Sequence, residues 1–231
     1  MKISIRGPIV SSNTHRFYQF YGMEATSPKS VADALAKGGG ERAEVEINSG
    51  GGEIFAASEI YTALCNYAGG VHIRIVGLAA SAASIIAMAG ESEMTPTGMM
   101  MIHNVQTSAD GDYRQMEHTA GVLRDANHAI TLAYMAKTGR SEQEIASMMD
   151  AETWITADRA VSLGLIDRVM EPGSEQKPLA ADFYSGMLSE DALRRAENFM
   201  KSQTTGSGFF MPERAQIEAK LKFLKLKGEL K

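Results

Sequence analysis

Short stretches in which apolar and polar residues alternate recur along the first half of the chain. The residues around Ile3–Ile5, Val45–Ile47 and Ile73–Ile75 follow this pattern, which predicts strands with one buried face. Segments with the composition of helices separate them. We expect helices from Pro28 to the glycines at 38–40, from about Phe55 to Tyr67, and over the small residues that stop at Gly90. Strands separated by helices indicate βαβ units and a mostly parallel sheet.

The second half continues this alternation. Met99–Ile102 is an apolar strand, and Tyr113–Thr138 has the pattern of one long helix that ends at Gly139. Ser141 with Glu144 three residues later forms a capping box, which marks the start of a further helix. We expect a short helix over Thr156–Leu163, ended by Gly164, and a last strand over Ile166–Val169.

The composition changes at Glu171-Pro172-Gly173. We therefore divide the chain into a core of residues 1–171 and a linker with a helical C-terminal extension over residues 172–231. Within the extension we expect a helix over Ser189–Ser202, a linker at Thr204–Gly208 and a helix from Pro212. We find no candidate chemistry in this part.

Composition narrows the functional classes. Hydrophobic residues make up 44 % of the chain and its formal net charge is −5. No basic patch with interleaved aromatic residues is present, so a nucleic acid is not an expected partner. The single cysteine, Cys65, excludes an internal disulfide and a Cys-based zinc cluster. Because no disulfide is needed, the cytoplasm is the default location. The apolar run Ile75–Gly90 is shorter than the roughly 20 residues of a membrane helix, and the first ten residues are too polar for a signal peptide.

Four short segments carry candidate chemistry. Gly50-Gly51-Gly52 follows a strand and leaves backbone N–H groups uncovered. Ser81 lies at the predicted start of a helix, where free N–H groups and the helix dipole would stabilise an oxyanion. His103 ends an apolar strand, and acidic residues precede Trp154. Each segment alone has an ordinary structural explanation, such as a tight turn or a helix cap.

Together the four segments supply a nucleophile, a base, an acid and an oxyanion hole, which favours acyl transfer by a serine hydrolase. The order Ser, His, acid differs from that of the α/β-hydrolases, and no GxSxG elbow is present. Ser84 is a weaker candidate nucleophile than Ser81 because it lies a turn deeper in the helix.

The same segments resemble the successive motifs of the Clp protease proteolytic subunit. They are Asn48–Gly52, Gly77–Ser84, Met101–His103 and Glu152–Ala157. The resemblance implies a Clp-protease/crotonase-like α/β fold of stacked ββα units, with Tyr113–Thr138 as the long handle helix through which subunits assemble.

The resemblance also implies roles for single residues. Ser81 is the nucleophile and His103 the base, and the N–H groups of Gly52 and Ala82 form the oxyanion hole. The aspartate of the family aligns with Glu152, which has a longer side chain, and Asp150 remains the second candidate for the acid. No metal and no cofactor are expected.

The expected function is therefore that of a serine endopeptidase that assembles into a ring-shaped homo-oligomer. The Ala-Ala-Ser-Ala-Ala-Ser run, the Glu-Thr-Trp segment and the C-terminal extension resemble the head-maturation (prohead) proteases of tailed phages. That resemblance implies phage scaffold and capsid proteins as substrates, and a location in the host cytoplasm or the prohead.

Three alternatives stay open. The first is a degradative peptidase fed by an ATP-dependent unfoldase. The second is a crotonase-like acyl-CoA hydratase or isomerase, which relies on carboxylates in its pocket and needs no Ser–His pair. The third is a non-catalytic shell or scaffold subunit, against which the presence of both Ser81 and His103 argues.

Overall fold

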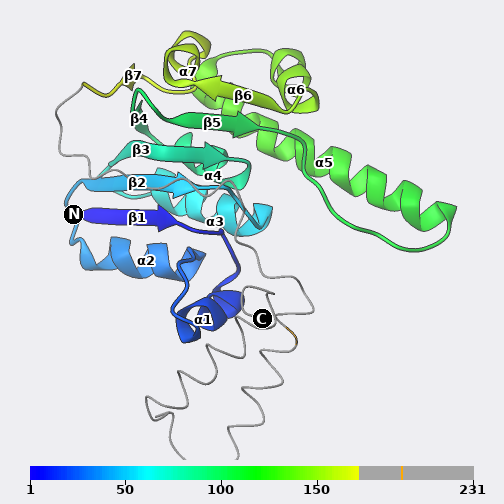
Figure 1. The fold of residues 1–231 in the computed structure, drawn as a ribbon, viewed down its shortest axis with the longest axis horizontal. Coiled ribbons are helices and arrows are strands. Elements are labelled where there is room, and N and C mark those ends of the chain that lie inside the picture. The colour runs from blue at the N-terminus through cyan, green and yellow to red at the C-terminus, as the bar shows by residue number, and fades with distance from the viewer. Residues whose placement is uncertain (172–193, 195–231) are drawn as a thin grey trace, which may run out of the picture.

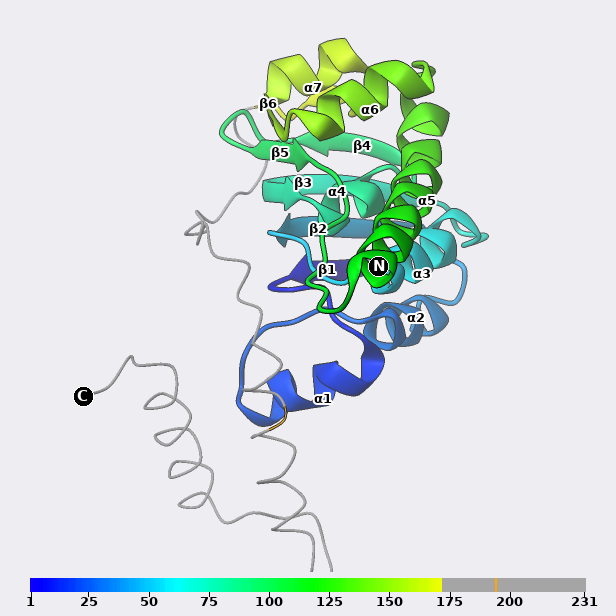
Figure 2. The same cartoon turned by 90° about the vertical axis from the view of Figure 1, so that its right-hand side faces the viewer.

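The computed structural model describes residues 1–171 and Arg194, and these residues form one seven-stranded sheet with helices packed mainly on one face (Figure 1). Seen along the sheet, helices α2, α3 and α5 lie on the same side (Figure 2). The elements in chain order are β1 (Lys2–Arg6), α1 (Ser12–Phe20), α2 (Pro28–Lys37), β2 (Ala43–Ser49), α3 (Ile54–Cys65), β3 (Val71–Ala80), α4 (Ala82–Ala87), β4 (Glu91–Met94), β5 (Met99–Ile102), α5 (Tyr113–Thr138), α6 (Glu142–Asp150), β6 (Thr153–Thr156), α7 (Ala157–Leu163) and β7 (Arg168–Val169).

Strand β3 organises the sheet because it shares one of its edges between two partners. The parallel order is β1-β2-β3-β4-β7, and β5 branches from β3. The first half of β3 pairs with β4, whereas its last residues, Leu78–Ala80, pair with Met99–Met101 of β5. Strand β6 then adds to β5 in the antiparallel sense. The end of β3 therefore lies beside the strand that leads into His103.

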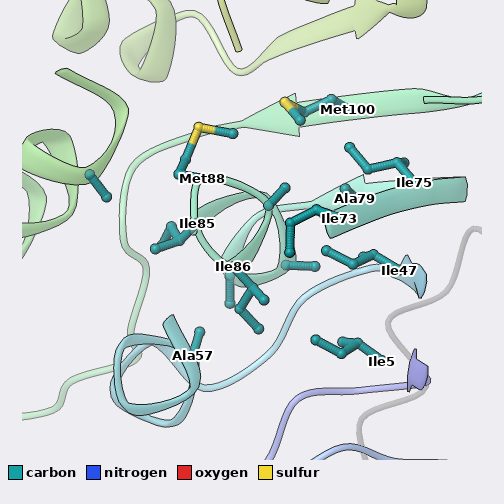
Figure 3. Packing of buried hydrophobic residues seen from close by; sticks show 14 of the residues in the cluster. Ile5, Ile47, Ala57, Ile73, Ile75, Ala79, Ile85, Ile86, Met88 and Met100 are labelled. Atoms are coloured by element: carbon teal, nitrogen blue, oxygen red, sulfur yellow. The ribbon is translucent and has the colours of Figure 1, made fainter. Parts of the chain in front are cut away.

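The helical face of the sheet carries the apolar core. Ile5, Ile47, Ile73 and Ile75 are fully buried, and Figure 3 shows them beside Ile86 of α4. Burying each such side chain contributes about 1.5–3 kcal/mol. All six residues of α4 are buried, so the short helix that begins after Ser81 lies inside the core.

The opposite face of the sheet is held by ion pairs between neighbouring strands. Arg74 of β3 lies 2.9 Å from Glu93 of β4 and 3.5 Å from Glu46 of β2, and Lys2 of β1 lies 2.8 Å from Glu46. Because side chains alternate along a strand, each central strand presents isoleucine to the helices and charge to this face.

The structure confirms the α/β class, the parallel sheet and most of the predicted helices. The predicted capping box at Ser141 is confirmed, and Ser27 also forms one, with Pro28 at the first position of α2. The long helix has the predicted bounds, Tyr113–Thr138, and ends at Gly139 with φ 68°.

Three elements were not predicted. Helix α1 buries only Phe17 and Tyr18, so its sequence lacks a regular apolar stripe. Strands β4 and β6 have four residues each, too few for a clear alternation. The helix predicted from Thr156 begins at Ala157, and the last strand is limited to Arg168–Val169. The helices predicted over 189–202 and from 212 lie outside the described residues.

Candidate active site

The strand register brings the four predicted segments to one edge of the sheet. Ser49 of β2 pairs with Ala79 of β3, Ala80 pairs with Met101 of β5, and Ile102 pairs with Thr153 of β6. The residues that flank these pairs are the glycine turn, Ser81, His103 and Glu152. The register therefore brings them together at the carboxyl ends of β2, β3 and β5, next to the start of β6; Figure 1 shows these strand ends side by side.

Ser81 occupies a sharp turn between β3 and α4. Its backbone has φ 54° and ψ −127°, a conformation that costs a residue with a side chain about 1–3 kcal/mol. Its N–H donates to the carbonyl oxygen of Met101 at 2.9 Å, which fixes the turn against β5. Its Oγ lies 2.6 Å from Nε2 of His103. The turn thus directs the hydroxyl to the imidazole.

His103 is partly buried, and burial lowers the pKa of its imidazole below the ordinary value, with the charge of Glu152 acting in the opposite direction. A neutral ring whose Nε2 accepts from the Ser81 hydroxyl carries its proton on Nδ1. Nδ1 is buried, and no hydrogen-bond partner for it is found within residues 1–171 or at Arg194. A neutral imidazole in this position can accept a proton from the Ser81 hydroxyl, and its Nδ1–H has no acceptor among the described residues.

The two candidate acids differ in their contacts. Glu152 is exposed, has φ 45°, and acts on His103 through its charge without a hydrogen bond between them in the described part of the chain. Asp150 accepts a hydrogen bond of 2.8 Å from Nδ2 of Asn104. Of the two, only Glu152 affects the pKa of His103.

The glycine turn supplies an uncovered N–H. Gly52 forms an isolated parallel bridge with Ile9, in which Ile9 uses its own N–H and C=O to bond Gly51 and Glu53. In such a bridge the N–H of the central residue points to the other side. Neither this N–H nor that of Ala82, the first residue of α4, donates a hydrogen bond among the residues the structure describes.

Gly51 is a site residue whose individual role was not predicted from the sequence. A Cβ on Gly51 would lie 2.7 Å from Cβ of Ser81 and 2.8 Å from the carbonyl oxygen of Ala80. The N–H of Gly51 is held by the hydroxyl of Ser49, which donates in turn to the carbonyl oxygen of Gly7. The glycine turn and the serine turn therefore pack directly against each other.

Ser84, the weaker candidate nucleophile, is fully buried and does not face the imidazole. Its hydroxyl donates to the carbonyl oxygen of Ser81 at 2.6 Å and lies 2.7 Å from the hydroxyl of Tyr134.

A serine hydroxyl bonded to an imidazole, beside two N–H groups that are unpaired among the described residues, one of them at the start of a helix, is the arrangement of a serine hydrolase. The family model of the Clp proteases matches residues 35–173, more than half of the chain. The chain belongs to the Clp protease family, and its homologues indicate that it is a serine-type endopeptidase.

Individual relatives agree with this assignment. The chain is 28 % identical over 159 residues to the ATP-dependent Clp protease proteolytic subunit 1 of Chlamydia abortus, covering 64 % of this chain and 83 % of that protein. It is 30 % identical over 138 residues to the protein of the same name from Streptomyces avermitilis, covering 58 % of this chain and 64 % of that protein.

The fold has a solved counterpart in an asparagine-to-aspartate mutant of ClpP1 from Listeria monocytogenes. The TM-score is 0.61 at 20 % identity, over 74 % of this chain and 92 % of the other. At that identity the likeness concerns the fold, which is the predicted Clp-protease fold. None of the helices within the described residues is long and apolar enough to span a membrane.

The packing of Gly51 against Ser81 generates a test. Gly51→Ala places a methyl group against backbone atoms of the serine turn, in a conformation (φ +100°) that alanine rarely adopts. We expect covalent labelling by a fluorophosphonate to slow at least about tenfold, since small displacements of reacting groups have large effects on rate. The rate of labelling, measured by intact-protein mass spectrometry, provides the readout.

Gly70→Ala is the matched control for Gly51→Ala. Gly70 also has positive φ (+72°) but has open space around its Cβ position. It should lower stability through backbone strain and leave the labelling rate unchanged. Equal labelling rates for Gly51→Ala and the unmodified chain would show that the contact does not position Ser81.

Proposed function

We propose that this chain is a Ser-His-acid endopeptidase in which Ser81 is the nucleophile, His103 the general base and Glu152 the acid. The observation that carries the proposal is the 2.6 Å contact between Ser81 Oγ and His103 Nε2 at the start of a buried helix. In this proposal His103 takes the hydroxyl proton as Ser81 Oγ attacks the carbonyl carbon of the scissile peptide bond. The same imidazole then gives that proton to the leaving amine, and a water molecule hydrolyses the acyl-enzyme.

The oxyanion that forms during the attack is assigned to the N–H groups of Gly52 and Ala82. Both are uncovered among the described residues, and Gly52 is directed away from its bridge partner Ile9. Ala82 follows the nucleophile and begins α4, so the partial positive charge of the helix start adds to its N–H. Donors fixed before the reaction stabilise the transition state without reorganisation.

Glu152 is the proposed acid because its charge acts on His103 and its carboxylate forms no hydrogen bond or ion pair among the described residues. The register places it one residue before Thr153, which pairs with Ile102 beside the base. In the active enzyme its carboxylate accepts the Nδ1–H of His103 and stabilises the imidazolium. Asp150 is engaged by Asn104 and is assigned no role in proton transfer.

For the biological substrate, we propose phage scaffold and capsid precursors. The support is the resemblance of Ala79–Ser84 and of the Glu152–Trp154 segment to head-maturation proteases. The names of the relatives in Chlamydia and Streptomyces support a second role, degradation in partnership with an ATP-dependent component. We further propose that residues 1–171 form the catalytic unit and residues 172–231 an appendage to it.

Helix α5 supports assembly into a ring-shaped homo-oligomer. Its buried residues lie only between Ile130 and Tyr134, and its first half projects beyond the sheet in Figure 1. The projecting part carries large apolar side chains that are exposed: Tyr113 (71 %), Met116 (39 %) and Val122 (49 %). We propose that a second copy of the chain covers this part, as the handle helix of the family does.

The identity of the nucleophile is tested by Ser81→Ala. This change should remove fluorophosphonate labelling and lower peptide hydrolysis by about 10⁴-fold or more, because it deletes the group that forms the acyl-enzyme. Circular dichroism should show an unchanged fold, since only a hydroxyl is lost. Persistent labelling of Ser81→Ala at another residue would move the nucleophile elsewhere.

The acid and the base are tested together by the pH profile of labelling. Only neutral His103 accepts the serine proton, and burial lowers its pKa. The rate should therefore remain on its plateau below pH 6.5, the ordinary pKa of histidine, and decline as further acidification protonates the ring. Glu152→Gln removes the charge that raises this pKa, so the acidic limb should shift to lower pH while the plateau rate falls by about 10²–10⁴-fold.

Asp150→Asn is the control for Glu152→Gln, because its amide oxygen still accepts from Asn104. A small effect of Asp150→Asn with a large effect of Glu152→Gln supports the assignment. The reverse ranking assigns the acid to Asp150, and two small effects indicate a Ser–His dyad.

Assembly is tested by Val122→Glu on the projecting part of α5. A charge there should turn a large species in sedimentation velocity into smaller ones, because a buried unpaired carboxylate opposes association. Val161→Glu on α7 is the matched control at a valine that is 36 % exposed. A monomeric unmodified chain at micromolar concentration would exclude the ring.

A further inference from the structure

The carbonyl group of Ser81 is held by two donors from one residue. The N–H of Ser84 donates to it at 2.9 Å and the Ser84 hydroxyl donates to it at 2.6 Å. On the other side of Ser81, its N–H is bonded to Met101. Both peptide groups next to the strained residue are therefore anchored, one to β5 and the other to α4.

The second of these peptide groups includes the N–H of Ala82. The described chain has no cis peptide bond, so this N–H points opposite to the Ser81 carbonyl. Any rotation of the peptide plane that would turn the N–H of Ala82 would also break the two hydrogen bonds to Ser84. The direction of this proposed oxyanion donor is thus set by the contacts of the carbonyl on its far side.

The Ser84 hydroxyl is itself fixed by a buried partner on α5. It has one proton, which goes to the Ser81 carbonyl, so the hydroxyl of Tyr134 must donate to Ser84 Oγ across 2.7 Å. Ser84 is 0 % exposed and Tyr134 is 1 % exposed. Burial raises the pKa of Tyr134, which keeps the phenol protonated and able to donate.

We propose that Ser84 and Tyr134 are positioning residues for the oxyanion hole, acting through the Ser81 carbonyl to hold the Ala82 N–H toward the substrate. The inference rests on the proposed roles of Ser81 and Ala82. It extends them by linking helix α5 to the reacting centre through one buried chain of hydrogen bonds, Tyr134 to Ser84 to Ser81.

This role differs from a purely structural one in what it predicts for kinetics. A positioning residue for the oxyanion hole acts on the transition state, so its loss lowers kcat and leaves KM nearly unchanged. Ser84→Ala keeps the backbone bond of residue 84 but removes the hydroxyl. We expect kcat to fall about ten- to a hundredfold, somewhat less than when an oxyanion donor is deleted outright.

The experiment separates this effect from stability by a double-mutant cycle. Ser84→Ala leaves the buried Tyr134 hydroxyl without its partner and should lower the Tm. In Ser84→Ala/Tyr134→Phe both polar groups are gone, so part of that loss should be recovered, because two matched apolar groups avoid an unsatisfied one. The double variant should nevertheless keep the low kcat of Ser84→Ala. Tyr134→Phe alone retains the Ser84 hydroxyl and should lower kcat less.

A second readout uses a peptide aldehyde that inhibits the unmodified enzyme. Its adduct with Ser81 places an oxyanion in the hole, whereas the matching peptide amide forms no adduct. Ser84→Ala should lower the affinity for the aldehyde by about the same factor by which it lowers kcat, and it should leave the affinity for the amide unchanged. Ser92→Ala is the control: it removes another fully buried hydroxyl, one bonded to Asp167, and should lower the Tm without changing kcat.

The proposal is overturned if Ser84→Ala has the same kcat and the same affinity for the aldehyde as the unmodified chain. It is also overturned if kcat and the aldehyde affinity recover together with the Tm in the double variant. Ser81→Ala is measured in parallel. If it remains active the proposed nucleophile is wrong, whereas an inactive Ser81→Ala beside a fully active Ser84→Ala refutes only the role of Ser84 and Tyr134.

Discussion

The division of one edge of β3 between two strands is the constraint on which the site depends. The first half of β3 pairs with β4 and its end pairs with β5. If β4 continued along the whole edge, Met101 could not accept the N–H of Ser81 and His103 would lie one strand farther away. The pairing of β3 with β5 thus brings the backbones of Ser81 and His103 close together, so that their side chains can contact each other directly.

The burial of α4 gives this geometry its rigidity. All six of its residues are buried, four of them alanine or serine, so the helix can approach the sheet closely. A short helix on the surface would allow the strained backbone of Ser81 to relax. Here relaxation would open the core around Ile85 and Ile86, two buried residues of α4 (Figure 3). The packing of α4 therefore opposes relaxation of the strained turn.

Much of the site could be predicted from the sequence because its members follow regular elements. Ser81 and His103 each come directly after a strand, and parallel strands end at the same edge of a sheet. The contacts that depend on three-dimensional packing could not be predicted. Gly51 touches Ser81 because two turns from different strands meet, and Tyr134 reaches Ser84 from 50 positions away.

The elements that were missed share a physical cause. Strands β4 and β6 are four residues long and gain their stability from pairing with β3 and β5, not from a local pattern. The helix predicted over Thr156–Leu163 begins one residue later, at Ala157, and no local pattern indicated the strand that precedes it. That strand is what places Glu152 beside His103.

Two unfavourable features of the described chain occur at this same place. The Nδ1–H of His103 is buried without an acceptor, and burying an unpaired donor costs about 1–3 kcal/mol. Glu152 has a left-handed backbone that disfavours residues with a side chain. A residue type free of strain, such as glycine, would avoid the second cost but would bring no carboxylate. Under the proposed triad, a hydrogen bond from the Nδ1–H of His103 to Glu152 removes the cost of the unpaired donor. The left-handed backbone of Glu152 then has a function as well, because it sets the direction in which the carboxylate side chain points. The longer side chain of glutamate would then need a backbone set further from the imidazole than aspartate would.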